Sequence, residues 1–297
     1  MKTYLDCIPC MIRQALDTTR FSTDDEILKR EVLEHVMLLL INFVQNDSSD
    51  EYPTPPQIGR HIYRIIKEIT KCEDPYREIK IKYNRMALNK YSELKSIIEN
   101  SSDSLLTAIK VAVAGNIIDF GINSGEFDLD SVLKDVLNKS FGICDYDLFQ
   151  SSLEKAKKIL YIGDNAGEIV FDKLLIEEIL KRYNLKIYFA VRGKPIINDV
   201  TIEDAKQVRM DAVAEIVDSG CDAPGIILEL CSKEFLKIYN EADLIISKGQ
   251  GNYETLDEED KKNIFFLFRA KCKIVAKHLK VKVNDIILKG GKKEGTC

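Results

Sequence analysis

Four short polar segments of the sequence contain the residue types that bind metal ions and anions. They are residues 163–168, 192–199, 218–222 and 248–252. Each follows an apolar run with the length and composition of a buried β-strand. Because ligands of open parallel sheets bind beyond the carboxyl ends of the strands, we expect the four segments to meet at one edge of a sheet.

Within these segments, Asp164, Asn165 and Asp199 provide the oxygen donors of a divalent-cation site. Carboxylate and amide oxygens are the ligands that Mg²⁺ and similar hard cations prefer. The backbone amides after Asn165 begin a predicted helix and are expected to contact a phosphate. Lys248 lies in a glycine-rich segment and is a natural counter-charge for that phosphate. A cation, anion-binding amides and a lysine around one cleft indicate phosphoryl transfer.

Each of these residues also has a simpler interpretation. Asp164 and Asn165 could cap the helix that follows them, and Asp199 could cap the next one. Lys248 could be solvated. A functional site is favoured because four polar segments converge. No single residue would be sufficient evidence for it.

The elements that must position these segments divide the chain in two. Residues 1–150 have apolar side chains at helical spacing, which predicts an all-helical domain and a lid over the site. In residues 151–297 short apolar strands alternate with helices, which predicts an α/β metal- and phosphate-binding domain. This repetition predicts a parallel-sheet, Rossmann-like three-layer fold. Strands are expected at residues 159–163, 186–191, 214–217, 244–247, 264–267 and 273–276.

Composition excludes several classes of protein. The 297 residues include 43 basic and 48 acidic side chains, for a net charge of −5 without a basic block, so we expect no nucleic-acid partner. No apolar run is long enough to span a bilayer and the first residues lack a hydrophobic leader, which predicts a soluble protein without a membrane partner. Eight scattered cysteines do not form a disulfide framework and indicate a reducing compartment, the cytoplasm.

The order of the polar segments resembles that of the domain of unknown function 89 family. These are the damage-control phosphatases, related to the protein called acidic residue methyltransferase 1. The motifs are Gly-Asp-Asn-Ala-Gly-Glu-Ile-Val-Phe-Asp from residue 163, Arg-Gly-Lys-Pro-Ile-Ile-Asn-Asp-Val-Thr from residue 192, Asp-Ser-Gly-Cys-Asp-Ala-Pro-Gly from residue 218 and Ser-Lys-Gly-Gln-Gly-Asn-Tyr-Glu from residue 247. Residues 5–10, 74–76 and 114–119 resemble a branch with an N-terminal Cys-x-x-Cys, so the resemblance covers nearly the whole chain.

The resemblance implies metal-dependent hydrolysis of small phosphomonoesters, either sugar phosphates or damaged phosphometabolites. By motif position, Asp164, Asn165 and Asp199 would hold a divalent metal ion, which could be Mn²⁺, Co²⁺, Ni²⁺ or Mg²⁺. Lys248 would contact the phosphate of a small phosphorylated metabolite. The catalytic residues would be Asp164 and Lys248, and Asp164 would either activate the attacking water or attack phosphorus directly.

The same motif positions imply five substrate-binding residues. Asn116 and Asp119 would reach the cleft from the helical half. Glu168, Asn198 and Asn252 would contact the substrate or support the residues that do.

Cys7 and Cys10 leave several interpretations open. One Cys-x-x-Cys pair is only half of a zinc site, and the three histidines of the chain are isolated from one another. A redox pair is a further possibility. Packing against the core or a structural ligand role is favoured over redox catalysis.

Two alternative functions come from other classes. An S-adenosylmethionine-dependent carboxyl methyltransferase normally needs closely spaced glycines, whereas Asp164 and Asn165 fill the space between Gly163 and Gly167. A non-catalytic phosphometabolite-binding protein would need no room for a catalytic water. The oligomeric state is left open.

Overall fold

The computed structural model describes residues 1–45, 53–117, 129–259 and 263–291. In this part of the chain a seven-stranded sheet forms the centre, with the order β1-β7-β6-β5-β2-β3-β4. Its strands are β1 (Phe141–Cys144), β2 (Lys158–Ile162), β3 (Lys186–Val191), β4 (Glu215–Asp218), β5 (Leu244–Lys248), β6 (Ile264–Arg269) and β7 (Ile286–Gly290).

The sheet is parallel through its middle and mixed at one edge. Neighbours from β6 to β4 all run parallel. β7 is antiparallel to β6 and parallel to β1. The chain leaves β2 for β3 and β4 on one side and later adds β5 and β6 on the other, so the order reverses at β2. At such a reversal, the carboxyl ends of the strands on the two sides form the walls of a crevice in which ligands bind.

Helices cover both faces of the sheet, which confirms the predicted three-layer α/β fold. On one face, Ile159 and Tyr161 of β2 share a core cluster with residues of α4, α5, α7 and α8. On the other, Leu160 and Ile162 share a cluster with α10, α11 and α12. The helices are α4 (Arg77–Glu99), α5 (Ser104–Ile117), α6 (Leu129–Asn138), α7 (Tyr146–Lys155), α8 (Glu168–Arg182), α9 (Ile202–Gln207), α10 (Lys233–Glu241), α11 (Gln250–Leu256) and α12 (Lys273–Leu279).

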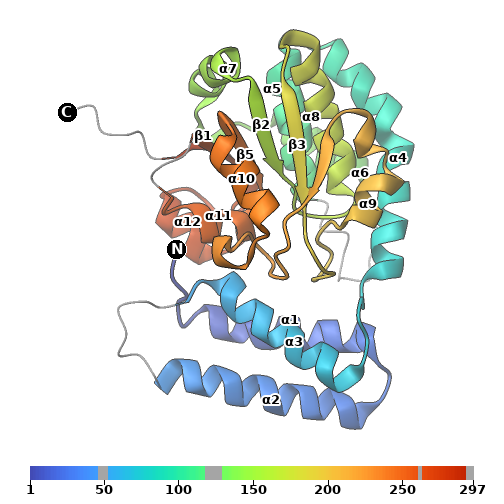
Figure 1. Cartoon of the computed structure of the whole chain (residues 1–297), viewed down its shortest axis with the longest axis vertical. Helices are drawn as coiled ribbons and strands as arrows, with labels where there is room; N and C mark the ends of the chain where they lie inside the picture. The colour runs from blue at the N-terminus through green and yellow to red at the C-terminus, as the bar shows by residue number, and fades with distance from the viewer. Residues whose placement is uncertain (46–52, 118–128, 260–262, 292–297) are drawn as a thin grey trace, which may run out of the picture.

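Three N-terminal helices form a layer of their own. They are α1 (Cys7–Ser22), α2 (Glu26–Gln45) and α3 (Pro55–Thr70), and their apolar faces make a separate core cluster. Figure 1 shows this layer below the sheet and its helices. None of the helices in the described ranges combines the length and apolar character that crossing a membrane requires.

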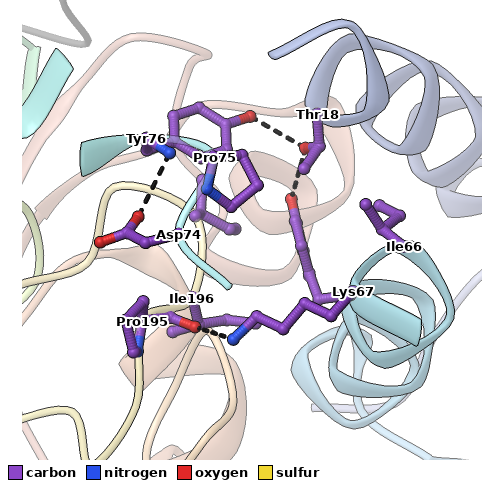
Figure 2. Close-up of a pocket in the computed structure, with 10 residues that line it drawn as sticks. Thr18, Ile66, Lys67, Asp74, Pro75, Tyr76, Pro195 and Ile196 are labelled. Atoms are coloured by element: carbon purple, nitrogen blue, oxygen red, sulfur yellow. Dashed lines mark hydrogen bonds between the residues drawn. The ribbon is translucent and has the colours of Figure 1, made fainter. Parts of the chain in front are cut away.

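The helices before residue 150 therefore fall into two groups. α4 and α5 pack against the sheet and α8, whereas α1–α3 pack on one another and contact the α/β part through α11 and through loops. Figure 2 shows one such contact, in which Lys67 Nζ donates to the Pro195 carbonyl at 2.6 Å and the Thr18 and Tyr76 hydroxyls lie 2.9 Å apart. A domain boundary near residue 150 and a lid role for the helical half stay predictions.

Two features of the fold differ from the sequence-based expectation. Residues 273–276, predicted as a strand, lie in α12, and the Sγ of Cys272 caps this helix by accepting from the Val275 amide at 3.5 Å. β1 and β7 were not predicted, because both are short; β1 is the edge strand and lies in the half predicted to be all-helical, and β7 lies between β1 and β6.

We expect the crossing of α5 over α8 to be intolerant of even one added methyl group. A Cβ at Gly115 would lie 2.6 Å from Cδ2 of Phe171 and 3.2 Å from the Cα of Glu168. Gly115→Ala should therefore lower the free energy of unfolding by about 1–3 kcal/mol in urea titrations. The matched Gly59→Ala should cost much less, since its Cβ would meet only Pro224 Cγ at 3.2 Å and alanine favours the helix. Equal losses would contradict the close packing.

Candidate active site

The reversal of strand order at β2 places two residues in direct contact. Asp164 follows β2, and Gly249 follows the neighbouring β5. Gly249 has φ +81°, and a Cβ there would lie 1.9 Å from Oδ2 of Asp164. Only glycine combines this backbone conformation with the close approach of a carboxylate. The Asp164 side chain is therefore held against the start of α11.

Backbone hydrogen bonds bring the third predicted ligand beside the first two. Asn165 and Asp199 form an isolated antiparallel bridge. The Val200 amide donates to the Asp164 carbonyl at 2.8 Å, and the Ala166 amide donates to the Asn198 carbonyl at 2.9 Å. Asp164 and Asp199 are 35 residues apart in the sequence. Together with Asn165 they nevertheless meet at the same edge of the sheet.

The loop that carries Asp199 has a strained backbone. Ile197 has φ +45°, which a β-branched residue rarely adopts. Such strain persists only where the surrounding contacts impose it, and it concentrates at functional sites. Asp199 itself accepts a 2.7 Å hydrogen bond from Nε of Arg192, and both side chains are almost fully buried. The arginine orients this carboxylate and offsets its charge.

The amide of Asn165 connects two carboxylates. Its Nδ2 donates to Asp164 Oδ2 at 2.8 Å and to Glu168 Oε2 at 3.1 Å. Both protons of the amide are used in this way, which leaves Oδ1 as the atom able to bind a cation.

Behind this layer lies the fully buried ammonium group of Lys248. It donates to the carboxylates of Glu168 and Asp172 and, at 2.9 Å, to the Ala112 carbonyl of α5. An ammonium group has three protons, so these three acceptors use all of them. The Tyr161 hydroxyl donates to the same oxygen of Asp172 at 2.7 Å.

The concentration of carboxylates shifts their pKa values. Burial, followed by the charges of Glu168 and Asp199, raises the pKa of Asp164 well above its usual range. Burial raises the pKa of Asp199 as well, against the opposing effect of Arg192. Burial raises the pKa of Asp172 to about 7, again in opposition to Lys248. Burial is therefore the main cause of these raised pKa values, and repulsion from neighbouring carboxylates adds to it at Asp164 and Asp172.

Asn252 supports the edge of the sheet from α11. Its Oδ1 accepts from Arg192 Nη2 at 3.0 Å and from the Ile226 amide at 2.9 Å. Its Nδ2 donates to the Lys248 carbonyl at 2.7 Å and to the Gly163 carbonyl at 3.3 Å. Asn252 is fully buried and joins four segments that border the site.

A cleft of about 440 Å³ opens in front of the carboxylates. Its walls come from the sheet edge, from α11 and α12, and from α1 and α3 of the N-terminal layer. The predicted residues among its lining are Cys7, Cys10, Asp164, Asn165, Asn198 and Asp199. The cleft therefore lies between the N-terminal layer and the carboxyl ends of the strands.

Other predicted site residues lie behind the cleft or cannot be placed. Glu168, Lys248 and Asn252 are fully buried and do not line it. Asn116 lies in α5, but its side chain is outside the described residues, as is the whole of Asp119.

The expectation that the amides after Asn165 bind phosphate is wrong for the first two. The Ala166 amide donates to the Asn198 carbonyl, and the Gly167 amide donates to Asn84 Oδ1 at 2.7 Å. Both are committed to holding the turn in place. Asn84 belongs to α4, so the helix layer on the sheet also fixes this turn.

The cleft also contains polar residues that the sequence analysis did not single out. Lys271 lines it, and its positive charge lowers the pKa of both Asp164 and Asp199, so it lies near them. Glu254 lines it from α11, two residues beyond the predicted Asn252. Glu254 is the last residue of the motif that begins at residue 247, so the motif was a signal for it. Lys271 follows a strand end and lies outside every quoted motif.

By donor type, Asp164, Asn165 and Asp199 fit a hard divalent cation. Two carboxylates and one amide oxygen face a cleft large enough to leave room for water. The charges of Glu168 and Asp199 help to raise the pKa of Asp164, and a cation among these groups would remove that repulsion. Among the residues that the structure describes, no three His, Cys, Asp or Glu side chains form a metal-binding group, so this set depends on the Asn165 amide.

The sheet, its reversal point and the cleft define an α/β protein with a candidate active site at the carboxyl ends of its strands. The chain belongs to the family described as Damage-control phosphatase ARMT1-like domain, which matches residues 3–287. This confirms the family resemblance found in the motifs. Membership of a branch with an N-terminal Cys-x-x-Cys stays a prediction.

Relatives match over nearly their whole length. An uncharacterized protein of Methanocaldococcus jannaschii is 40% identical, with 95% of this chain and 93% of the relative covered. A damage-control phosphatase of Archaeoglobus fulgidus is 36% identical, with 95% and 97% covered. The crystal structure of a domain of unknown function 89 family protein from Pyrococcus horikoshii is 33% identical, with 98% of this chain and 100% of that chain covered and a TM-score of 0.87.

Removing the buried ammonium should destabilise the fold more than removing an exposed one. Lys248→Met leaves the carboxylates of Glu168 and Asp172 buried without their cation, which should cost about 3–5 kcal/mol of unfolding free energy. Urea titration measures the loss. The control Lys158→Met removes a solvent-exposed pair with Glu241 and should change stability far less. Similar losses in the two variants would show that the Lys248 cluster does not stabilise the site.

Proposed function

We propose that this chain is a metal-dependent phosphatase that hydrolyses small phosphomonoesters, such as sugar phosphates or damaged phosphometabolites. The observation that carries the proposal is the convergence of Asp164, Asn165 and Asp199 on one cleft beside Lys271. Relatives of similar length from Archaeoglobus fulgidus and Pyrococcus horikoshii are named damage-control phosphatases, which supports the same reaction class.

Asp164, Asn165 and Asp199 would hold the divalent cation. When bound, it would supply positive charge to the phosphate oxygens and lower the pKa of water. Arg192 would keep Asp199 in place, and Gly249 would keep Asp164 against the start of α11. The chemistry of the ligands does not distinguish Mn²⁺, Co²⁺ and Ni²⁺ from Mg²⁺.

The two lysines of the site would have different roles. Lys271 lines the cleft and would bind a substrate phosphate oxygen. Lys248 has no proton left for substrate, and we assign it to positioning Glu168, which in turn accepts from the Asn165 amide. Asn252 would be a positioning residue too, whereas Asn198 lines the cleft and remains our candidate for substrate contact.

Asp164 would accept the proton of the attacking water. A carboxylate at the cleft wall that is shielded from bulk water is suited to act as a general base. Its position at the cleft surface, 7% exposed, allows contact with a bound water. Cleavage would then release alcohol and inorganic phosphate.

Neither alternative function is favoured by a specific observation. A cofactor-binding loop of the methyltransferase kind would need open space after the strands, but Gly249 packs directly against the Asp164 carboxylate. A non-catalytic binding protein would show tight sugar-phosphate binding without turnover.

The proposed lid would be the α1–α3 layer, because Cys7, Cys10, Pro56 and Gly59 of these helices line the cleft.

Metal binding and catalysis should disappear together when one ligand is changed. We expect wild-type protein to hydrolyse p-nitrophenyl phosphate, to lose this activity in chelator and to regain it with Mn²⁺ or another divalent cation. Asp164→Asn should lose about 10²–10⁴-fold in kcat. It should also lose the increase in melting temperature that the cation produces in the wild type.

The exposed Asp211 provides a matched control, because Asp211→Asn makes the same chemical change far from the cleft. This variant should behave as wild type in both assays. Full activity in chelator, or full activity of Asp164→Asn, would contradict the proposed function.

A further inference from the structure

We propose that Glu254 is the general acid that protonates the leaving-group oxygen of the phosphomonoester, an inference that rests on the proposed phosphatase function. Glu254 lies in α11, and its side chain forms part of the cleft wall while remaining only 7% exposed. A carboxyl group that faces a substrate cleft but is shielded from bulk water is suited to donate a proton.

The position of Glu254 in the fold matches the path of a leaving group. Gly249 contacts Asp164 at the reacting end of the cleft, and α11 begins at the next residue. Glu254 lies one helical turn after Gln250, away from the strand ends. Residues of α1 and α3 line the same cleft as Glu254, so we expect the ester group of a phosphate bound at the carboxylates to extend along these walls.

Hydrogen bonds fix the orientation of the carboxyl group. Gln250 Nε2 donates to Glu254 Oε1 at 2.8 Å. The amide of Gln250 is itself fixed, because its Oε1 accepts from the Lys271 backbone amide at 3.0 Å. The carbonyl oxygen is the better acceptor of a protonated carboxyl group, so this hydrogen bond favours Oε2 as the atom that carries the acidic proton.

The surroundings of Glu254 favour the protonated form near neutral pH. Burial raises its pKa to about 7, although the Gln250 hydrogen bond and the N-terminal ammonium oppose the shift. That ammonium donates to the Glu254 carbonyl at 2.8 Å and is also paired with Glu258.

Three thiols line the same cleft as Glu254, together with the charged side chains of Asp6, Lys271 and Lys273. Cys7 and Cys10 come from α1, and Cys272 precedes α12. Burial, and to a smaller extent the charge of Glu254, raises the pKa of Cys7 and of Cys10, so both are neutral near pH 7. Cys7 and Cys10 therefore add neutral groups to the cleft near Glu254.

The proton balance of the reaction is complete with these two carboxyl groups. As the bond from phosphorus to the ester oxygen breaks, the Glu254 proton passes to that oxygen and the alcohol leaves. The attacking water forms the new bond to phosphorus and gives its proton to Asp164. Exchange with solvent then returns one proton to Glu254 and removes one from Asp164, so no net proton is consumed.

A change of leaving group tests this role directly. p-Nitrophenolate is a weak base that departs without protonation, whereas the alkoxide of an alkyl or sugar phosphate needs a proton. Glu254→Gln should reduce kcat for an alkyl phosphate by about 10²–10⁴-fold and produce a much smaller loss with p-nitrophenyl phosphate. Glu254→Asp, which withdraws the carboxyl group, should show the same selectivity to a smaller degree.

Glu258→Gln is the matched control, since Glu258 is 76% exposed on the neighbouring segment and contacts only the N-terminal ammonium in the described structure. It should leave the ratio of the two activities unchanged. Equal losses on both substrates in the Glu254 variants, or no loss on either, would overturn the general-acid role while leaving the phosphatase function intact. Failure of the wild type to hydrolyse either substrate would instead overturn the proposed function, and this role with it.

Discussion

The site depends on one buried ammonium group that joins three parts of the fold. Lys248 ends β5, its acceptors Glu168 and Asp172 lie on α8, and the Ala112 carbonyl belongs to α5. Burial favours the neutral amine, but the two carboxylates outweigh it and raise the pKa of Lys248, which stays charged. Because Glu168 also accepts from the Asn165 amide, this ion pair sets the orientation of a residue that faces the cleft.

Beside the Lys248 cluster, the fold buries two further carboxylates, those of Asp164 and Asp199, at the wall of the cleft. The backbone bridge between Asn165 and Asp199 and the hydrogen bond from the Val200 amide to the Asp164 carbonyl hold Asp164 and Asp199 side by side, and Arg192 forms an ion pair with Asp199. Such an arrangement is costly in the protein alone, and the cost appears as raised pKa values. A divalent cation and the phosphate it attracts would turn this repulsion into binding and catalysis, which is the physical basis of the proposed activity.

Local sequence patterns predicted the central strands and the closeness of Asp164, Asn165 and Asp199, because both follow from strand periodicity and from the rule that parallel strands end at one edge. They did not predict the partners of Lys248, which lie 76 and 80 residues away. Nor did they predict that Lys271 and Glu254 line the cleft, because this depends on how α11 and α12 pack. The antiparallel β7 and the helix at 273–276 were missed for the same reason, since tertiary contacts decided short ambiguous segments.

The central claim is that Asp164, Asn165 and Asp199 bind one divalent cation at the carboxyl end of the sheet. Anomalous diffraction from crystals grown with Mn²⁺ tests this most directly. The account predicts a single strong anomalous peak within ligand distance of oxygen atoms of all three side chains, and its loss in crystals of Asp164→Asn. A peak elsewhere in the cleft, or unchanged Mn²⁺ occupancy in the variant, would contradict it.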